Sequence, residues 1–151
     1  MMRLEIESAV FEITQRVGRI PLHTTARVAE ECEKSAVMVA NIAKRSVMKG
    51  PKTGEVYKRG QGGKGKKKPL HQASAPGQPP ATDTGGLASS IVSRAKALTA
   101  EAGAFAKHGV WMEEGTERVS PRPFIEPALK AVEVGHVNRM VRALRAAANE
   151  A

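Results

Sequence analysis

Residues 60–67 carry the spacing that nucleotide chemistry most often uses. Gly60 to Gly65 fits G-x-G-x-x-G, and Gly60 to Lys66 fits the first seven positions of a P-loop. A P-loop then needs Ser or Thr as a magnesium ligand, but this chain has Lys67. Both motifs also need a buried strand before them and a helix after them, so that phosphate meets a helix N-terminus. The flanking Val-Tyr-Lys-Arg and Lys-Lys-Pro favour neither element, so we reject nucleotide binding and expect no cofactor.

Metal and thiol chemistry have few candidate residues. The one cysteine, Cys32, excludes an internal disulfide and fits a reducing compartment. The histidines are far apart in the sequence, and no two have the i, i+4 spacing of ligands on one helix face: His23, His71, His108 and His136. The sequence therefore predicts no metal site.

Acid–base and nucleophilic chemistry are no better supported. A hydrolase triad can be drawn from four polar residues, but no nucleophile-elbow sequence surrounds either serine: Ser89, Ser90, Asp83 and His108. Glu113 and Glu114 are adjacent, so their carboxylates diverge on a helix. We predict that the protein is not an enzyme.

The strongest physical signal is a basic segment. The net charge is +9, and of the 24 basic and 15 acidic residues, ten basic ones and Glu55 lie between Lys44 and Lys68, which leaves 14 of each elsewhere. The segment is either a solvated loop or a contact with phosphates or an acidic protein surface. Tyr57 is its one aromatic residue, so nucleic-acid contact would be limited to the backbone. The candidate contact residues are Tyr57, Arg59, Lys64, Lys66, Lys67 and Lys68.

The hydrophobic pattern predicts an α+β fold in a single domain, residues 1–151. We expect a short strand over 2–8 and the longest helix from about His23 to Met48, ended by Gly50-Pro51. A small antiparallel hairpin follows, with strands at 87–96 and 98–105 joined near Ala97-Leu98. A helical turn over 106–114 ends at Gly115, and a last helix runs over roughly 124–149.

Two apolar stripes predict the core. Small side chains dominate the stripe of the long helix, which lets a neighbouring element approach closely: Val28, Cys32, Ala36, Val39, Ala43 and Val47. The stripe of the last helix includes a histidine that we expect to be a partly buried core residue: Ile125, Leu129, Val132, His136, Met140 and Leu144. Because aromatic residues are only 3% of the chain, the core suits a subunit that completes its burial against neighbours.

Residues 50–82 form a flexible basic arm, rich in Gly and Pro, between the long helix and the hairpin. Their scarcity of apolar side chains predicts that the arm is mobile in the free protein. Its prolines exclude regular structure over residues 71–80, and Gly77 can turn with positive φ. Asp83 to Gly86 then reads as a turn that leads into the hairpin.

The N-terminus has no secretory pattern. Arg3, Glu5 and Glu7 stand where a signal peptide needs an apolar run. No stretch approaches the roughly 20 apolar residues of a membrane span. We expect a soluble cytoplasmic protein.

Three sequence blocks carry a family resemblance. Residues 74–80 (Ser-Ala-Pro-Gly-Gln-Pro-Pro), with Asp83-Thr84-Gly85-Gly86-Leu87 and Ser90-Ile91, resemble the SAPG-x-PP…DTG-x-L…SI block of tailed-phage head–tail joining proteins. This is the neck or tail-completion family of siphophages and prophages, which includes minor tail proteins. Residues 113–116 (Glu-Glu-Gly-Thr) are similar to its E-F-G-T, with Glu114 where the family usually has an aromatic residue. Residues 122–129 resemble its RPF-x-x-PAL, and Pro51-Lys52-Thr53-Gly54 followed by Tyr57 also fits.

The resemblance implies a virion subunit that assembles, in the host cytoplasm, into a homo-oligomeric ring, a hexamer in that family. The ring would complete the tail and join it to the head. It would contact adjacent tail-terminator and head-completion or connector proteins, with DNA passing non-specifically through the channel and no membrane partner. The arm would order on docking, with a stiff part at Pro76, Gly77, Pro79 and Pro80 and an electrostatic part at the lysines.

The remaining motif residues are expected to be structural. They are Asp83, Thr84, Gly85, Leu87, Ile91, Glu113, Gly115, Thr116, Arg122, Pro123, Phe124, Pro127 and Leu129. We interpret Phe124 as a core anchor and Arg122 as a partner for Glu113. The rival hypothesis is a sequence-independent nucleic-acid-binding module that uses the basic segment Lys44–Lys68.

Overall fold

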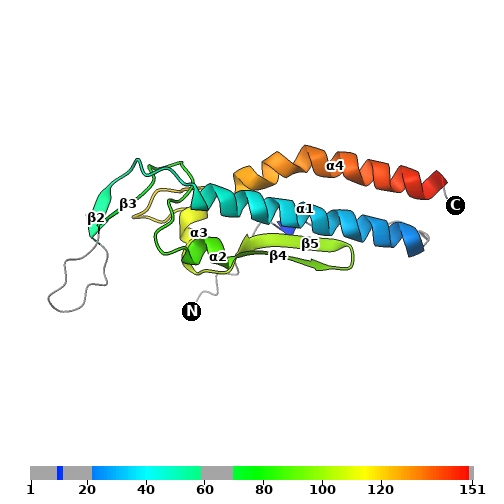
Figure 1. The fold of residues 1–151 in the computed structure, drawn as a ribbon, viewed down its shortest axis with the longest axis horizontal. Coiled ribbons are helices and arrows are strands. Elements are labelled where there is room, and N and C mark those ends of the chain that lie inside the picture. Colours follow the sequence, from blue (N-terminus) through cyan, green and yellow to red (C-terminus); the bar gives the residue numbers. More distant parts are fainter. Residues whose placement is uncertain (1–9, 12–21, 59–69, 150–151) are drawn as a thin grey trace.

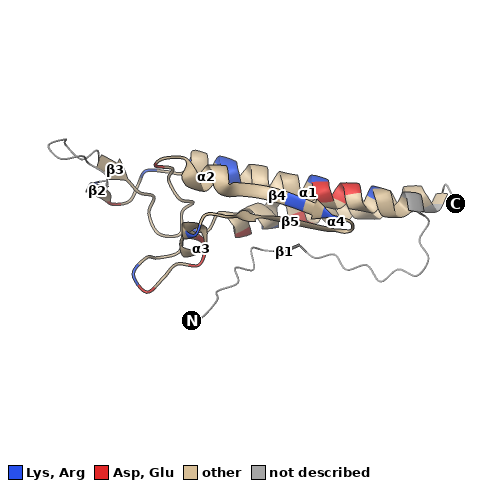
Figure 2. Ribbon diagram, turned by 90° about the horizontal axis from the view of Figure 1, so that it is seen from below, with Lys and Arg blue, Asp and Glu red and all other residues tan. Residues whose placement is uncertain are grey.

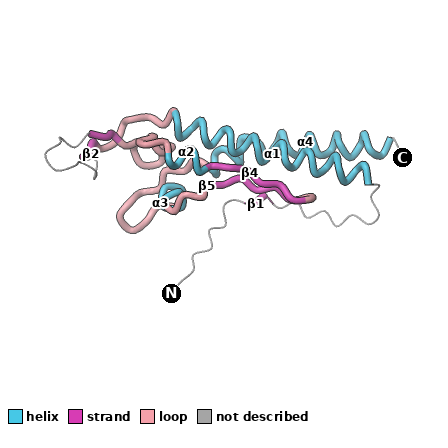
Figure 3. The backbone as a smooth tube through the Cα atoms, turned by 60° about the horizontal axis from the view of Figure 1, so that its bottom comes forward, coloured by secondary structure: helices cyan, strands magenta, loops and turns pink. Residues whose placement is uncertain are grey.

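The computed structural model describes residues 10–11, 22–58 and 70–149. Helix α1 (Leu22–Met48) lies between helix α4 (Ile125–Asn149) and a hairpin of strands β4 (Ile91–Lys96) and β5 (Thr99–Ala104) (Figure 1). The two helices are antiparallel and lie on the same side of the strands (Figure 3). The predicted α+β fold, with a long first helix and a C-terminal helix, is therefore confirmed.

The main sheet of the described residues is antiparallel throughout. Strand β1 (Val10–Phe11) pairs with β5, which gives the strand order β1-β5-β4. The β4–β5 register runs from Ile91 opposite Ala104 to Lys96 opposite Thr99, so the turn lies at Ala97-Leu98, as predicted. The strand predicted over residues 2–8 lies outside the described residues.

One predicted strand boundary is wrong. Residues 87–90 were expected to begin the hairpin, but helix α2 (Gly86–Ser90) occupies this stretch and β4 begins at Ile91. Both serine hydroxyls donate to carbonyls three residues back, Ser89 to Gly86 at 3.0 Å and Ser90 to Leu87 at 2.7 Å. These bonds and the burial of Ala88 favour a helical turn over an extended strand.

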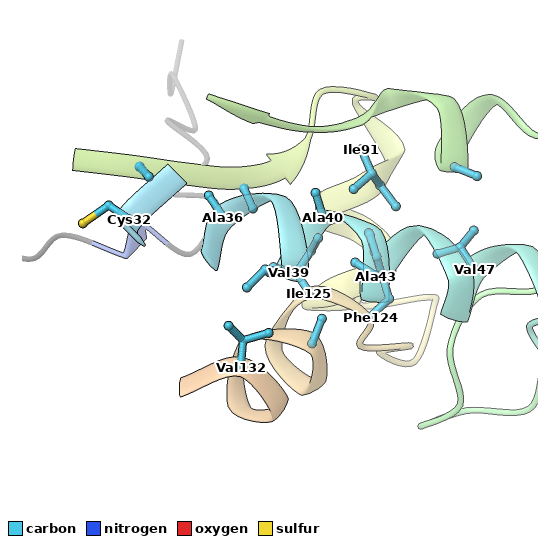
Figure 4. Packing of buried hydrophobic residues seen from close by; sticks show 14 of the residues in the cluster. Cys32, Ala36, Val39, Ala40, Ala43, Val47, Ile91, Phe124, Ile125 and Val132 are labelled. Atoms are coloured by element: carbon cyan, nitrogen blue, oxygen red, sulfur yellow. The ribbon is translucent and has the colours of Figure 1, made fainter. Parts of the chain in front are cut away.

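The core is built on the small-residue stripe of α1. All six residues predicted for this stripe are buried: Val28, Cys32, Ala36, Val39, Ala43 and Val47. Their side chains meet α4 on one side and the hairpin on the other (Figure 4). Because alanines occupy several of these positions, both partners approach the helix closely and the layers interdigitate.

Helix α4 supplies the second half of the core. Ile125, Val132, His136 and Met140 are buried on the predicted face, and Leu129 and Leu144 pack beside them. Phe124, just before the helix, is 1% exposed and is the largest of the fully buried side chains. The interpretation of Phe124 as a core anchor is consistent with this burial.

A polar cluster joins α1 to α4 inside this interface. The hydroxyl of Ser35 donates to the carbonyl of Glu31 at 2.9 Å, and Nδ1 of His136 lies 2.7 Å from the same Ser35 oxygen. Arg139 donates to this oxygen at 2.8 Å, and its Nε lies 3.4 Å from a carboxylate oxygen of Glu31. His136, expected to be partly buried, is thus completely buried in a network that fixes the helix register.

Burial, and next the charge of Arg139, lower the pKa of His136, while Glu31 opposes the shift. We predict that the free energy of unfolding falls as the pH decreases below about 6.5, because the unfolded chain then takes up a proton that the folded chain refuses. The free energy of unfolding continues to fall until the pH reaches the lowered pKa that His136 has in the folded protein. It changes by at most about 1.4 kcal/mol per pH unit. Urea denaturation between about pH 7.5 and 5.5 measures it.

His108→Gln is the matched control for this prediction. It removes an exposed histidine, so the pH dependence should remain. His136→Gln should flatten the curve over the same pH range. An unchanged slope in His136→Gln would assign the effect to another group.

Candidate assembly site at the base of the arm

The arm contains a two-stranded ribbon. Strands β2 (Val56–Lys58) and β3 (Leu70–Gln72) pair antiparallel, with Tyr57 opposite His71. The ribbon projects beyond the end of the helices (Figure 1). The expectation that residues 71–80 lack regular structure is therefore wrong at His71 and Gln72, because cross-strand pairing supplies the hydrogen bonds that the local sequence does not predict.

The ribbon presents apolar side chains to solvent. Val56, Tyr57 and Leu70 are all exposed. The ring of Tyr57 packs edge-on against His71, with 5.2 Å between centroids, and His71 itself is buried. Arg59, Lys64, Lys66, Lys67 and Lys68 lie outside the described residues. The ribbon thus offers an exposed apolar surface within the arm.

Backbone hydrogen bonds continue the ribbon toward the body. The amide of Gly54 donates to Ala73 at 2.8 Å, and the amide of Ala73 donates to Glu55 at 3.0 Å. The hydroxyl of Thr53 donates to the side-chain oxygen of Gln78. A Cβ on Gly54 would lie 2.3 Å from the carbonyl oxygen of Ser74, so the two chain segments can meet at this distance only around glycine.

A turn at Pro76-Gly77 ties this structure to the segment before α4. Gly77 has φ of +77°, as expected, and Gln78 donates to Ala75 across the turn, which suits a type II geometry. The Gly77 amide donates to the carbonyl of Pro121 at 2.9 Å. Pro80 is buried and Pro79 is half-buried, whereas Pro76 and Gly77 are exposed, so only the end of this stretch packs on the body.

Arg122 connects the same two segments. Its Nε donates to the carbonyl of Ser74 at 3.2 Å, and its amide donates to the carbonyl of Met112. The expected pairing of Arg122 with Glu113 is not formed. Glu113 has taken a different role, because backbone donors compete for its carboxylate.

Glu113 caps the N-terminus of α4. Its carboxylate, at the end of helix α3 (His108–Glu113), accepts from the amides of Phe124, Ile125 and Glu126 at 2.8 to 2.9 Å. These are the amides that the first turn of a helix leaves without partners, and a negative charge there also suits the helix dipole. Glu114 points elsewhere and is exposed, in agreement with the divergence expected of adjacent residues.

The Gly115-Thr116 pair returns the chain from α3 to α4. Gly115 has φ of +80°, and a Cβ there would lie 2.8 Å from the carbonyl of Val119. Thr116 bridges to Val119, and its hydroxyl accepts from the amide of Val119 at 3.1 Å. This tight loop brings Pro121 and Arg122 to the residues that they bind in the arm.

The motif residues therefore converge. Blocks around residues 51–57, 74–87 and 113–129, which are separate in the sequence, meet through the contacts above. We call this set of contacts the arm junction. Most of its polar groups bind backbone atoms, so the junction holds the ribbon, α3 and α4 in one arrangement.

A cleft of about 330 Å³ opens at the arm junction. Its polar lining includes Tyr57, His71, Ser74, His108 and Arg122. Nδ1 of His71 lies 3.3 Å from a carboxylate oxygen of Asp83, which lies beside the left-handed Gly85 (φ +81°). The cleft brings together two histidines that are distant in the sequence, a placement that no spacing argument could anticipate.

The triad considered from the sequence is not assembled in the described structure. Ser89 and Ser90 donate to helix carbonyls, and Asp83 contacts His71. No group of three His, Cys, Asp or Glu residues in the described ranges could hold a metal ion. No helix in the described part of the chain is both long and apolar enough to span a bilayer.

Comparison with known proteins finds no family model, no curated protein and no solved structure that matches this chain. The resemblance to head–tail joining proteins therefore depends on the motif blocks themselves.

Glu113→Ala should lower the free energy of unfolding by about 1–2 kcal/mol, because three amides at the start of α4 lose their acceptor. Urea denaturation measures the change. Glu114→Ala is the matched control, since its side chain is exposed and should shift stability by less than about 0.5 kcal/mol. Equal effects of the two variants would contradict the capping role.

Gly54→Ala should loosen the arm junction, because the new methyl group collides with the Ser74 carbonyl. We expect a loss of about 1–3 kcal/mol and faster hydrogen exchange at the Ala73 amide. Gly86→Ala is the control, since the nearest heavy atom to its Cβ would be Thr84 Oγ1 at 3.5 Å, an ordinary contact. If the Ala73 amide stays protected from hydrogen exchange in Gly54→Ala, the close approach of the two segments is not needed for the arm junction.

Proposed function

We propose that this chain is a structural subunit of a tailed-phage neck, which forms a homo-oligomeric ring, completes the tail and joins it to the DNA-filled head. The observation that carries the proposal is that residues 51–57, 74–87 and 113–129, which hold most of the motif residues, meet at the arm junction. The blocks that resemble one family occur in the same order as in that family, and they also contact one another in the structure. These contacts fix how the ribbon projects from the body.

The chemistry of the arm junction favours a structural role over a catalytic one. The carboxylate of Glu113 is saturated by helix amides, and Arg122 is held by the Ser74 carbonyl. Groups used in this way position the backbone, which is what a subunit needs when its arm must meet a neighbour at a set angle.

The ribbon supplies a suitable contact surface. Its exposed Val56, Tyr57 and Leu70 can bury apolar area against a neighbouring subunit or ring. The basic residues near it suit an acidic protein surface or the phosphates of DNA in the channel. In this proposal the contact between protein surfaces joins the head to the tail, and the contact with DNA is non-specific.

The test separates the apolar surface of the ribbon from the charge of the arm. In one variant Val56, Tyr57 and Leu70 become Thr, which suits a paired strand and removes the exposed apolar side chains. In the other, Lys64, Lys66, Lys67 and Lys68 become Gln. Both are compared with the full chain by light scattering after size exclusion and by joining of heads to tails assembled without this protein.

We expect the full chain to join heads to tails, the variant without the apolar ribbon side chains to lose joining, and the Gln variant to retain most of it. Duplex-DNA binding by the free subunit should be weak at about 50 and 200 mM salt. A monomer that binds duplex DNA tightly through these lysines, with a steep salt dependence, and that is indifferent to tails would overturn the proposal in favour of the nucleic-acid-binding module.

A further inference from the structure

The cleft at the arm junction contains an arginine that no described carboxylate neutralises. Arg122 lines the cleft and is half-buried, and none of the acidic residues in the described ranges forms an ion pair with it. Glu113, the acid expected to pair with Arg122, accepts from the amides of α4. A guanidinium that has lost part of its water is stabilised by a counter-charge, so this cation favours an anionic ligand.

Two hydrogen bonds hold Arg122 in place. Its amide donates to the carbonyl of Met112, and its Nε donates to the carbonyl of Ser74. Its Nη1 and Nη2 bind no atom of the described residues. These two nitrogens form a planar fork that matches two oxygens of a carboxylate or phosphate. Because the guanidinium is already oriented, a ligand would bind it with little further loss of side-chain entropy.

The other polar groups of the cleft leave an oxyanion with few competitors. Ser74 is 1% exposed, and its hydroxyl has no hydrogen-bond partner among the described residues. Rotation about χ1 can direct this hydroxyl to a ligand oxygen. His108 is exposed and can also donate. Asp83 is the one carboxylate in the lining, and it lies 3.3 Å from Nδ1 of His71.

Apolar side chains line the rest of the cleft: Val47, Leu87, Met112 and Val119. Val47 is completely buried, so the cleft reaches the core at the end of α1. Its volume of about 330 Å³ suits a small organic molecule. A ligand with one acidic group and an apolar part would use both kinds of lining.

We propose that the cleft is a binding site for a small organic acid. The carboxylate or phosphate group of the ligand meets Arg122 and Ser74, and its apolar part meets Leu87, Met112 and Val119. The inference goes beyond the proposed function and does not depend on it, because it uses only the lining of the cleft.

The experiment is a calorimetric titration of the full chain at about 150 mM salt, where the attraction of anions to distant surface charges is largely screened. Hexanoate, hexyl phosphate and hexanamide are the probes, since they share an alkyl chain and differ in the group that would meet Arg122. We expect at least one of the two anions to bind at least about tenfold more tightly than hexanamide. Their relative affinity identifies the preferred oxyanion. Equal binding of hexanamide, or no binding of either anion at about 10 mM, overturns the inference.

Variants locate the anion in the cleft. Arg122→Gln should weaken binding at least about tenfold, and Ser74→Ala at least about threefold. Ser74→Ala should not lower the melting temperature, because the hydroxyl that it removes has no partner among the described residues.

Two controls remove positive charge elsewhere. Arg94→Gln removes a guanidinium that lies over the Phe105 ring on β4, where Figure 2 shows basic residues in blue and which contributes no lining to the cleft. The variant with Gln at positions 64, 66, 67 and 68 removes the lysines of the arm. Both should bind the anion as the full chain does. Loss of binding in either one would place the anion outside the cleft and overturn the inference.

Arg122 also holds the arm junction, so its variant needs a structural measurement. Hydrogen exchange at the Gly77 amide, which donates to the Pro121 carbonyl, reports whether the junction is intact. Weakened binding in Arg122→Gln with Gly77 still protected supports direct contact. If protection is lost as well, Ser74→Ala decides, because it keeps the carbonyl that holds Arg122. Unchanged binding in Ser74→Ala would then overturn the inference.

Discussion

The close approach of two partners to the small-residue face of α1 is the constraint on which the rest of the structure depends. Ala36, Ala40 and Ala43 leave room for α4 on one side and the hairpin on the other, so one helix organises both halves of the core. A larger residue at any of these positions would push one layer away, because interiors are packed to near-crystalline density. Phe124 fills the remaining volume at one end of the helices.

The polar cluster between α1 and α4 adds specificity to this apolar contact. The Ser35 oxygen accepts from Arg139 and lies within hydrogen-bond distance of His136 in this register of the two helices, and a slip along the interface would separate these buried polar groups. The buried polar contacts therefore define how α1 and α4 are aligned along their length.

The arm junction transfers this order to the ribbon. Glu113 binds the first amides of α4, and the loop that follows it supplies Pro121 and Arg122 to the arm. The orientation of the ribbon is therefore coupled to the position of α4 through backbone contacts. In the ring subunit that we propose, this coupling would lower the ordering cost of assembly.

The sequence by itself determined the elements whose signal is local: both long helices, their buried faces, the Ala97-Leu98 turn, the turn at Gly77 and the end of α3 shortly before Gly115. Periodicity and backbone restrictions act over a few residues, so they can be read in order along the chain. Tertiary structure decided the rest. The helical turn at residues 86–90 depends on the packing of Ala88 in the core. The β2–β3 ribbon depends on pairing between two segments of the arm. The capping role of Glu113 depends on amides more than ten residues away in the sequence. Each outcome is settled by a partner distant in sequence, whose energy outweighs a weak local preference.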